Sequence, residues 1–198
     1  MKEVHRCEWA GTDPIYIEYH DKEWGIPVHN DIKLFEMLIL EGMQAGLSWI
    51  TILKKREAFR EAFREAFDGF DPDKVAFYKT DKVEELMKNK GIIRNRRKIE
   101  AAIQNARLFL VIQGQYGSFD KFIWSYVDNT PIIGKVDNIK ELPATTPLSD
   151  KISKDLKEMG FKFVGSTIIY SFMQAVGMVD NHTIWCFCHT KNRENKWK

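Results

Sequence analysis

Apolar residues recur at intervals of three and four positions along most of the chain, a spacing typical of helices that bury one face. The clearest case begins at Asp31, which we expect to cap a helix whose apolar face carries Leu34, Phe35 and Leu38. No alternation of apolar and polar residues lasts long enough to build a sheet. The sequence therefore predicts an all-α fold. Further helices are expected over 48–56, 57–67, 82–88, 95–111, 118–124 and 164–176, and from Ser149 or Asp150 to just before Gly160.

The predicted helix over 57–67 repeats Glu-Ala-Phe three times and so places Phe59, Phe63 and Phe67 on one face. We interpret this face as a packing surface rather than a ligand site. The segment 130–147 holds three prolines and several turn residues, and it is expected to be the longest irregular connection.

Composition narrows the class of protein without identifying a partner. The 198 residues are 44% apolar and suffice for one large domain or two small lobes that share a cleft. The net charge of +2 is small, so any contact with nucleic acid must come from a local basic patch. The N-terminal residues carry no apolar secretory segment, and the run 163–179 is too polar for a confident membrane span. The odd number of cysteines, three, then favours reduced thiols and a cytoplasmic location.

A tight turn at Gly91 joins two predicted helices, with Arg94 and Lys98 close by. In a helix-hairpin-helix, the backbone amides of such a turn bind a DNA phosphate without reading the base sequence. An ordinary pair of helices with a glycine C-cap would give the same pattern. From these residues alone, both interpretations stay open.

Thiols and imidazoles lie near both ends of the chain. Cys7 and His20 come early, and His182 and Cys186 come late at a four-residue spacing. Two thiolates and two imidazoles suit a closed tetrahedral zinc site, which would be structural. Buried cysteines without a metal are also common, and Cys188, His189 and His5 are possible substitutes in the set.

An acidic residue, Glu41, interrupts an otherwise apolar helix and is followed by a glycine-flanked turn and Trp49. With Tyr16, Tyr19, Trp9 and Trp24 upstream, these residues suit a pocket that stacks on a flipped base and bonds to its edge. The alternative is that Glu41 faces solvent and Trp49 belongs to the core.

Four longer segments together resemble the 3-methyladenine DNA glycosylase I family. They are DPIYIEYHDKEWG at 13–25, LFEMLILEGMQAGLSWITILKKRE at 34–57, GIIRNRRKI at 91–99 and GFKFVGSTIIYSFMQA at 160–175. The likeness extends from Arg6 to about Cys186, nearly the whole chain. Several long segments in the same order are far more specific than any one motif.

The resemblance implies an all-α helix-hairpin-helix DNA glycosylase fold, with residues 1–198 forming one unit. One lobe would contain the hairpin around 86–109, and a structural zinc would clip the N- and C-terminal segments into the other. The implied zinc ligands are Cys7, His20, His182 and Cys186. The implied site has Glu41 as the catalytic residue, Tyr16, Tyr19, Trp49 and Trp9 around the base, and Gln44, Leu47, Gly91, Arg94 and Lys98 on the DNA.

The resemblance also implies the reaction. A monomeric enzyme would hydrolyse the N-glycosidic bond of 3-methyladenine in double-stranded DNA, without lyase activity. Leu47 would be the wedge that fills the gap left by the extruded nucleotide. Two other classes of protein are expected to differ from this sequence pattern. A DNA-binding protein without catalysis does not need the acidic aromatic pocket. A zinc hydrolase needs an open coordination position on its metal ion.

Two features depart from the family pattern, and a third distinguishes the family itself from other helix-hairpin-helix glycosylases. The Glu-Ala-Phe repeat is about one helical turn longer than the family pattern, and the tail after Cys188 has no counterpart. Other helix-hairpin-helix glycosylases place a catalytic aspartate after the hairpin, where this chain has none. Asp180, in a Val-Asp-Asn-His string, is a weak alternative because it lies beside an expected zinc ligand.

Overall fold

The computed structural model describes residues 4–56 and 68–193. The predicted helix over 57–67 lies outside the described residues. The longer helices are α1 (Pro14–Lys22), α2 (Asp31–Gln44), α5 (Thr80–Lys88), α6 (Arg96–Tyr116), α8 (Pro147–Glu158) and α9 (Ser166–Ala175). Shorter ones are α4 (Pro72–Val75), α7 (Phe119–Trp124) and α10 (Thr190–Arg193), with four 3-10 turns at Glu8–Ala10, Asp68–Phe70, Ser125–Val127 and Ile139–Glu141. Residues 49–56 are also helical.

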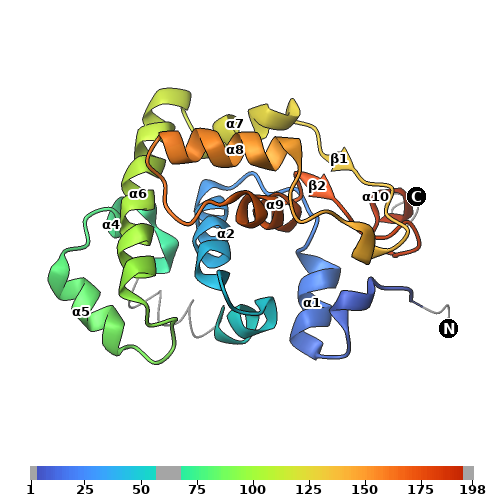
Figure 1. Cartoon of the computed structure of the whole chain (residues 1–198), viewed down its shortest axis with the longest axis horizontal. Coiled ribbons are helices and arrows are strands. Elements are labelled where there is room, and N and C mark those ends of the chain that lie inside the picture. Colours follow the sequence, from blue (N-terminus) through green and yellow to red (C-terminus); the bar gives the residue numbers. More distant parts are fainter. Residues whose placement is uncertain (1–3, 57–67, 194–198) are drawn as a thin grey trace.

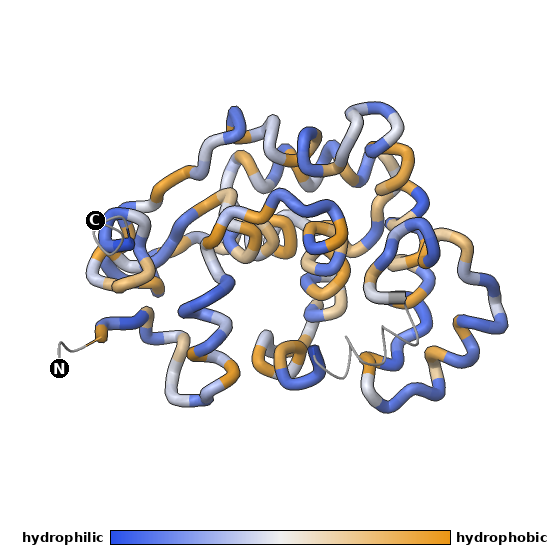
Figure 2. Tube along the Cα trace, turned by 180° about the vertical axis from the view of Figure 1, so that it is seen from behind, coloured by the Kyte–Doolittle hydropathy of each residue, from blue (hydrophilic) through white to orange (hydrophobic). Residues whose placement is uncertain are grey.

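Helix α2 lies at the centre of this predominantly helical fold, beside α9 and between α6 and α1 (Figure 1). Ten consecutive residues of α2, from Leu34 to Met43, are buried. Apolar residues concentrate on α2 and α9, and polar residues are more frequent on the outer helices (Figure 2). Because α2 is buried on every side over this stretch, its one acidic residue near the C-terminal end, Glu41, lies inside the protein.

The expectation of an all-α fold is corrected by one small feature. Strand β1 (Ile132–Ile133) pairs in parallel with β2 (Val179–Asp180), with Ile132 opposite Val179. Two residues per strand are too few to show an alternating pattern, which explains why the sequence did not reveal them. The pair fastens the irregular segment after α7 to the segment that follows α9 (Figure 1).

Two helices begin at residues other than those predicted. Asn30, not Asp31, caps α2, and its side chain accepts the Lys33 N–H. The Asp31 carboxylate instead accepts the backbone N–H groups of Phe119 and Asp120 at the start of α7. Thr146 caps α8 in a reciprocal capping box with Ser149, so Ser149 lies within the first turn rather than before it.

Residues 89–95 connect α5 to α6 and correspond to the predicted hairpin. The C-cap of α5 is Asn89, and its side chain accepts the Gly91 N–H at 2.8 Å. Gly91 is therefore not the C-cap that the alternative interpretation required. Asn95 caps α6, which continues to Tyr116, five residues beyond the predicted end at Val111. Ser118 caps α7 as predicted.

The segments near the two ends of the chain lie at the same side of the molecule (Figure 1). The Phe187 N–H donates to the His5 carbonyl at 3.0 Å, and Cys7 approaches Thr183 and Cys186. In the part of the chain that the structure describes, no helix has both the length and the apolar character needed to cross a bilayer.

Candidate active site and metal cluster

A cavity of about 340 Å³ opens between α1, α2, α9 and residues 139–144. Its aromatic lining comes mainly from the N-terminal part of the chain, and its polar lining comes from α2 and α9. The lining residues are Trp9, Tyr16, Tyr19, Trp24, Glu41, Gln44, Trp49, Ile139, Leu142, Pro143, Ala144, Thr167, Tyr170, Ser171 and Gln174. All five residues predicted for the base pocket are among them. A flat aromatic ligand with a polar edge fits such a lining.

Glu41 is the acidic residue of this lining and is only 3% exposed. Burial raises the pKa of its carboxyl group to about 8. Its Oε2 has no hydrogen-bond partner within the described residues. An unsatisfied buried carboxyl oxygen costs free energy, so the donor that Glu41 lacks within the protein must come from a molecule inside the cavity, such as water or a bound ligand. The alternative in which Glu41 faces solvent is excluded.

Two further unsatisfied polar atoms belong to the same lining. The indole Nε1 atoms of Trp9 and Trp49 are buried and have no acceptor within the described part of the chain. Trp9 packs edge-on against Tyr16 at 5.1 Å and Trp24 at 4.9 Å between ring centroids. Trp49 lies 5.5 Å from Tyr19. Within the described lining, Glu41 thus offers one unsatisfied buried oxygen, and Trp9 and Trp49 offer two unsatisfied N–H donors, to a bound ligand.

Helix α9 contributes a wall that the sequence reading missed. Thr167, Tyr170, Ser171 and Gln174 line the cavity, although none of them was among the residues predicted for the site. Their spacing of three and four residues puts them on one face. That polar stripe in an otherwise apolar helix was the signal that could have identified the wall.

The residues predicted to contact DNA separate into two groups. Gln44 lines the cavity, Leu47 is 42% exposed beside it, and Arg94 is exposed in the 89–95 connection with Gly91 half-buried. Lys98 differs, because its side chain is only 9% exposed and its ammonium group donates to the carbonyls of Met43 and Ala45. The surface position expected for Lys98 is therefore corrected to an internal one.

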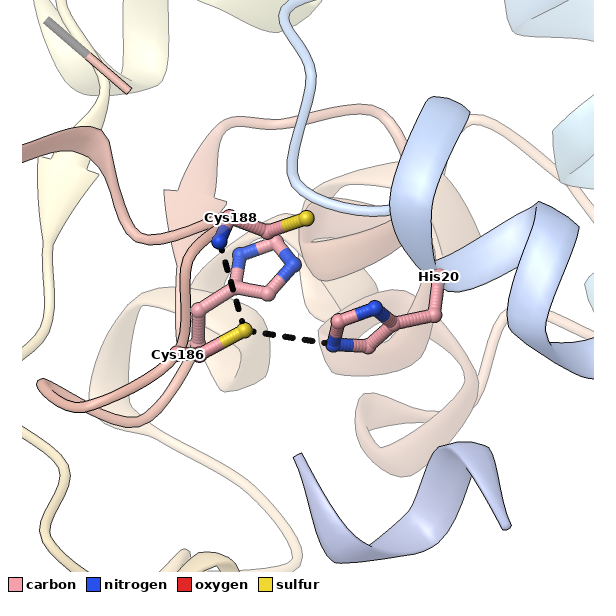
Figure 3. Close-up of side chains that lie close together, drawn as sticks. His20, Cys186 and Cys188 are labelled. Atoms are coloured by element: carbon pink, nitrogen blue, oxygen red, sulfur yellow. Dashed lines mark hydrogen bonds between the residues drawn. The ribbon is translucent and has the colours of Figure 1, made fainter. Parts of the chain in front are cut away.

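A second cluster lies where α1 meets the segment after β2. The ligand atoms of His20, His182, Cys186 and Cys188 are buried and lie within 4.8 Å of one another (Figure 3 labels three of these residues). Cys186 Sγ is 3.4 Å from His20 Nε2. Thiols and imidazoles in such a group could hold a metal ion.

Carboxylates orient both imidazoles of the cluster. His20 Nδ1 lies 2.8 Å from Asp21 Oδ1, and His182 Nδ1 lies 2.7 Å from Asp180 Oδ1. Each bond leaves Nε2 free to face the cluster, and His182 Nε2 is buried without a partner in the described residues. This carboxylate–imidazole arrangement is the usual support of a metal-bound histidine.

The membership of the cluster differs from the predicted set in one thiol. Cys188 occupies the compact group, and Cys7 lies at its edge, where its thiol forms a hydrogen bond with Cys186 and accepts the Thr183 N–H at 3.4 Å. The hydrogen bonds from Cys188 and Cys7 lower the pKa of the Cys186 thiol well below its usual range. A thiolate at Cys186 is the form that binds a metal.

Asp180 is fully engaged away from the cavity. It accepts hydrogen bonds from His182 and from the backbone and side chain of Thr190, and it is 1% exposed. It is not among the lining residues of the pocket. Its place in the fold is that of a support for His182, which removes it as an alternative catalytic residue.

Comparison with known proteins gives a consistent result. Residues 9–189 match the family described as methyladenine glycosylase. The chain is 50% identical to DNA-3-methyladenine glycosylase 1 of Escherichia coli K12 over 96% of its own length and 100% of that protein. It is 48% identical to the DNA-3-methyladenine glycosylase of Haemophilus influenzae Rd over 93% of this chain and 98% of the relative.

Solved structures show the same similarity. A crystal structure of a 3-methyladenine DNA glycosylase I has a TM-score of 0.88 and 52% identity, covering 93% of this chain and all of the other. The enzyme from Staphylococcus aureus, studied for its recognition of 3-methyladenine, also has a TM-score of 0.88, with 40% identity over 93% and 96% of the two chains.

Proposed function

The chain belongs to the methyladenine glycosylase family, and on that premise we propose how its pocket performs the reaction. The enzyme acts in base-excision repair: it hydrolyses the N-glycosidic bond of 3-methyladenine in alkylated DNA, releases the free base and leaves an abasic site. The observation that carries the proposal for the site is the unsatisfied, buried Glu41 carboxyl group beside two unsatisfied indole N–H groups.

Glu41 is proposed to recognise the amino edge of the extruded base. Its free oxygen accepts a hydrogen bond from the adenine amino group, and its ionised form stabilises the positive charge that N3 methylation places on the base. Guanine is disfavoured because its O6 is an acceptor and would meet the Glu41 acceptor in a dry pocket. Stacking on Trp49 and the neighbouring tyrosine rings fixes the plane of the bound base.

The chemical step needs little help from an acid. Water adds to the sugar C1′ as the C1′–N9 bond breaks, and the bonding pair neutralises the cationic base, which leaves as 3-methyladenine while the water loses a proton to solvent. Selective capture of the base is therefore the main contribution of the pocket. Among the described residues, no lysine lines the cavity, in line with the proposal of hydrolysis without a Schiff base and hence without lyase activity.

Contacts with double-stranded DNA are assigned to the rim of the pocket and to the hairpin. Leu47 enters the gap left by the extruded nucleotide, with Gln44 beside it. The 89–95 connection with Gly91 and Arg94 binds backbone phosphate in the manner of a helix-hairpin-helix. The exposure of Leu47 and Arg94 supports these roles. The enzyme is proposed to act as a monomer on chromosomal DNA in the cytoplasm.

The histidine–cysteine cluster is proposed to hold a structural zinc ion. The oriented imidazoles, the orphaned His182 Nε2 and the thiolate at Cys186 fit the chemistry of zinc. His20, His182 and Cys186 would be ligands. The fourth ligand would be either Cys188, whose thiol lies in the compact group, or Cys7, which the family resemblance implies and whose thiol forms a hydrogen bond with Cys186. Bound zinc would supply a cross-link between α1 and the segment after β2, and a set of four protein ligands would make the site structural rather than catalytic.

The role of Glu41 is tested with Glu41→Gln in single-turnover excision on duplex DNA that contains one 3-methyladenine. We expect a loss of at least about a hundredfold in rate, because an amide retains an acceptor but loses the charge. DNA affinity, measured by fluorescence anisotropy, should change little. Glu158→Gln, an exposed substitution on α8, is the matched control and should behave as the unmodified enzyme. An unchanged rate in folded Glu41→Gln would refute the role.

A further inference from the structure

We propose that Lys98 is a positioning residue that fixes the pocket end of α2 against the first turn of α6. This inference rests on the proposed function of Glu41 and the 44–47 segment, and it adds a residue that does not touch the base. It also replaces the direct DNA contact expected for Lys98 from the sequence.

The geometry of the Lys98 side chain is the first part of the case. Its Nζ donates to the Met43 carbonyl at 2.8 Å and to the Ala45 carbonyl at 2.7 Å. The last carbonyl groups of a helix have no partners within the helix, and a cation there also favours the helix dipole. Lys98 is 9% exposed, so these bonds form away from bulk water, where they are strongest.

The two carbonyls flank the functional end of α2. Gln44, between them, lines the pocket, and Glu41 lies two residues before Met43 and four before Ala45. Beyond them the backbone leaves the helix: Gly46 has a φ of +80° and leads to the exposed Leu47. The turn is closed by its own backbone hydrogen bonds, from the Leu47 N–H to the Gln44 carbonyl and from the Ala45 N–H to the Gly42 carbonyl. These bonds shape the turn but do not attach it to another element, whereas the bonds from Lys98 attach it to α6 and so help to decide where Gln44 and Leu47 lie.

The other end of Lys98 is attached to the proposed DNA anchor. Lys98 lies in the first turn of α6, where its backbone N–H donates to the side chain of the cap, Asn95. Asn95 in turn ends the 89–95 connection. One side chain thus links the element expected to bind phosphate with the element that carries Glu41. A shift of about 1 Å in a reacting group is enough to lower a rate about a hundredfold.

Other roles for this ammonium group fit the structure less well. Burial and two carbonyl partners keep it from a DNA phosphate. It is not in the cavity lining, so it is not placed to attack the sugar. Burial also lowers the pKa of Lys98, and a fold gains little stability from a charge that must be desolvated. A role in positioning the 44–47 turn explains why a buried lysine occupies position 98.

The test compares Lys98→Met, which keeps the length of the side chain but has no donor, with Lys98→Arg, which keeps donors. Single-turnover excision at saturating enzyme, DNA affinity and the salt dependence of that affinity are measured for both and for the unmodified enzyme. We expect Lys98→Met to lose tenfold to a hundredfold in rate, with the salt slope unchanged, and Lys98→Arg to recover part of the loss.

Three results would overturn the proposal. One is an unmodified rate in folded Lys98→Met. Another is a full loss in both variants, without rescue by arginine. The third is a salt slope lowered by about one, which marks a phosphate contact. If Lys98→Met does not fold, Lys98→Gln is measured instead; an intermediate rate supports the proposal and an unmodified rate contradicts it. Base release by the unmodified enzyme shows separately whether the proposed function holds.

Discussion

Glu41 is the residue on which the proposed recognition depends, and its environment explains both its pKa and its use. It lies on the most buried helix of the fold, its Oε2 has no partner in the described residues, and its pKa is raised to about 8. A protein retains such a carboxyl group only where something compensates its burial, and a cationic base with an amino group does so.

The raised pKa predicts how activity depends on pH. Below about pH 8 the carboxyl group of the free enzyme is mostly protonated, and only the ionised form favours the cationic base. The value of kcat/KM should therefore fall about tenfold per pH unit below about 8 and level off above it. Kinetics across this range check the prediction, with Glu41→Gln as the variant that loses the dependence. A profile that falls as pH rises would show that the protonated form is the active one.

At the residue scale, the sequence identified functional residues where the residue type and its neighbours along the chain are informative. It did not reveal roles that depend on the direction in which a side chain points. An acidic residue within an apolar helix is visible in any sequence, and so are clustered tryptophans. The side on which Lys98 points is not visible, because a lysine at the start of a helix usually faces solvent. The proposed metal ligands near the two ends of the chain could not be paired from local sequence either. Cys186 and His20 are 166 residues apart, and only the family resemblance assigned them to one metal site.

At the scale of elements, α9 forms the wall of the cavity that the sequence did not reveal, and α8 packs against it. The two helices pack together, and α9 turns its polar stripe toward the cavity. The spacing of apolar residues predicted which segments form the long helices, but it did not predict the residues at which those helices begin and end. Asn30 and Asp31 are both good capping residues, and only the contact of Asp31 with α7 decides which one caps α2. Such a contact spans 88 residues and leaves no mark in the local pattern.

The capping box at the start of α8 gives a prediction for this element. Thr146→Ala removes the acceptor for the Ser149 N–H and should lower the free energy of unfolding by about 1 kcal/mol. Thr145→Ala, one residue earlier, changes the same atoms outside the cap and should alter stability by less than about 0.5 kcal/mol. Urea denaturation of both variants makes the comparison. Equal effects would mean that the capping box does not stabilise α8.

At the scale of the whole molecule, the cluster of His20, His182 and Cys186 holds α1 against the segment after β2, far from the hairpin (Figure 1). The division into a hairpin lobe and a lobe of terminal segments stays a prediction. Whether or not the chain divides into these lobes, the pocket lies between α1 on one side and α2 and α9 on the other. A cross-link at α1 therefore affects the stability of the pocket wall that α1 forms.

Removal of the metal distinguishes a structural from a catalytic ion. We expect one zinc per chain, and a stability lower by about 4 kcal/mol without it if free zinc was a thousand times its Kd. Excision should persist in the metal-free enzyme at temperatures where it stays folded. His182→Ala should lose zinc, whereas His29→Ala, at an exposed histidine, should keep it. Elemental analysis and thermal unfolding give the readouts; activity that disappears together with zinc in a folded sample would show a catalytic ion.

The most direct test of the account is the identity of the bases released from methylated duplex DNA, resolved by chromatography. The pocket geometry predicts rapid release of 3-methyladenine, much slower release of methylated guanines, and loss of release in Glu41→Gln. A folded, zinc-loaded enzyme that releases no base, or that releases methylated guanines as readily as 3-methyladenine, would contradict the assignment of this pocket.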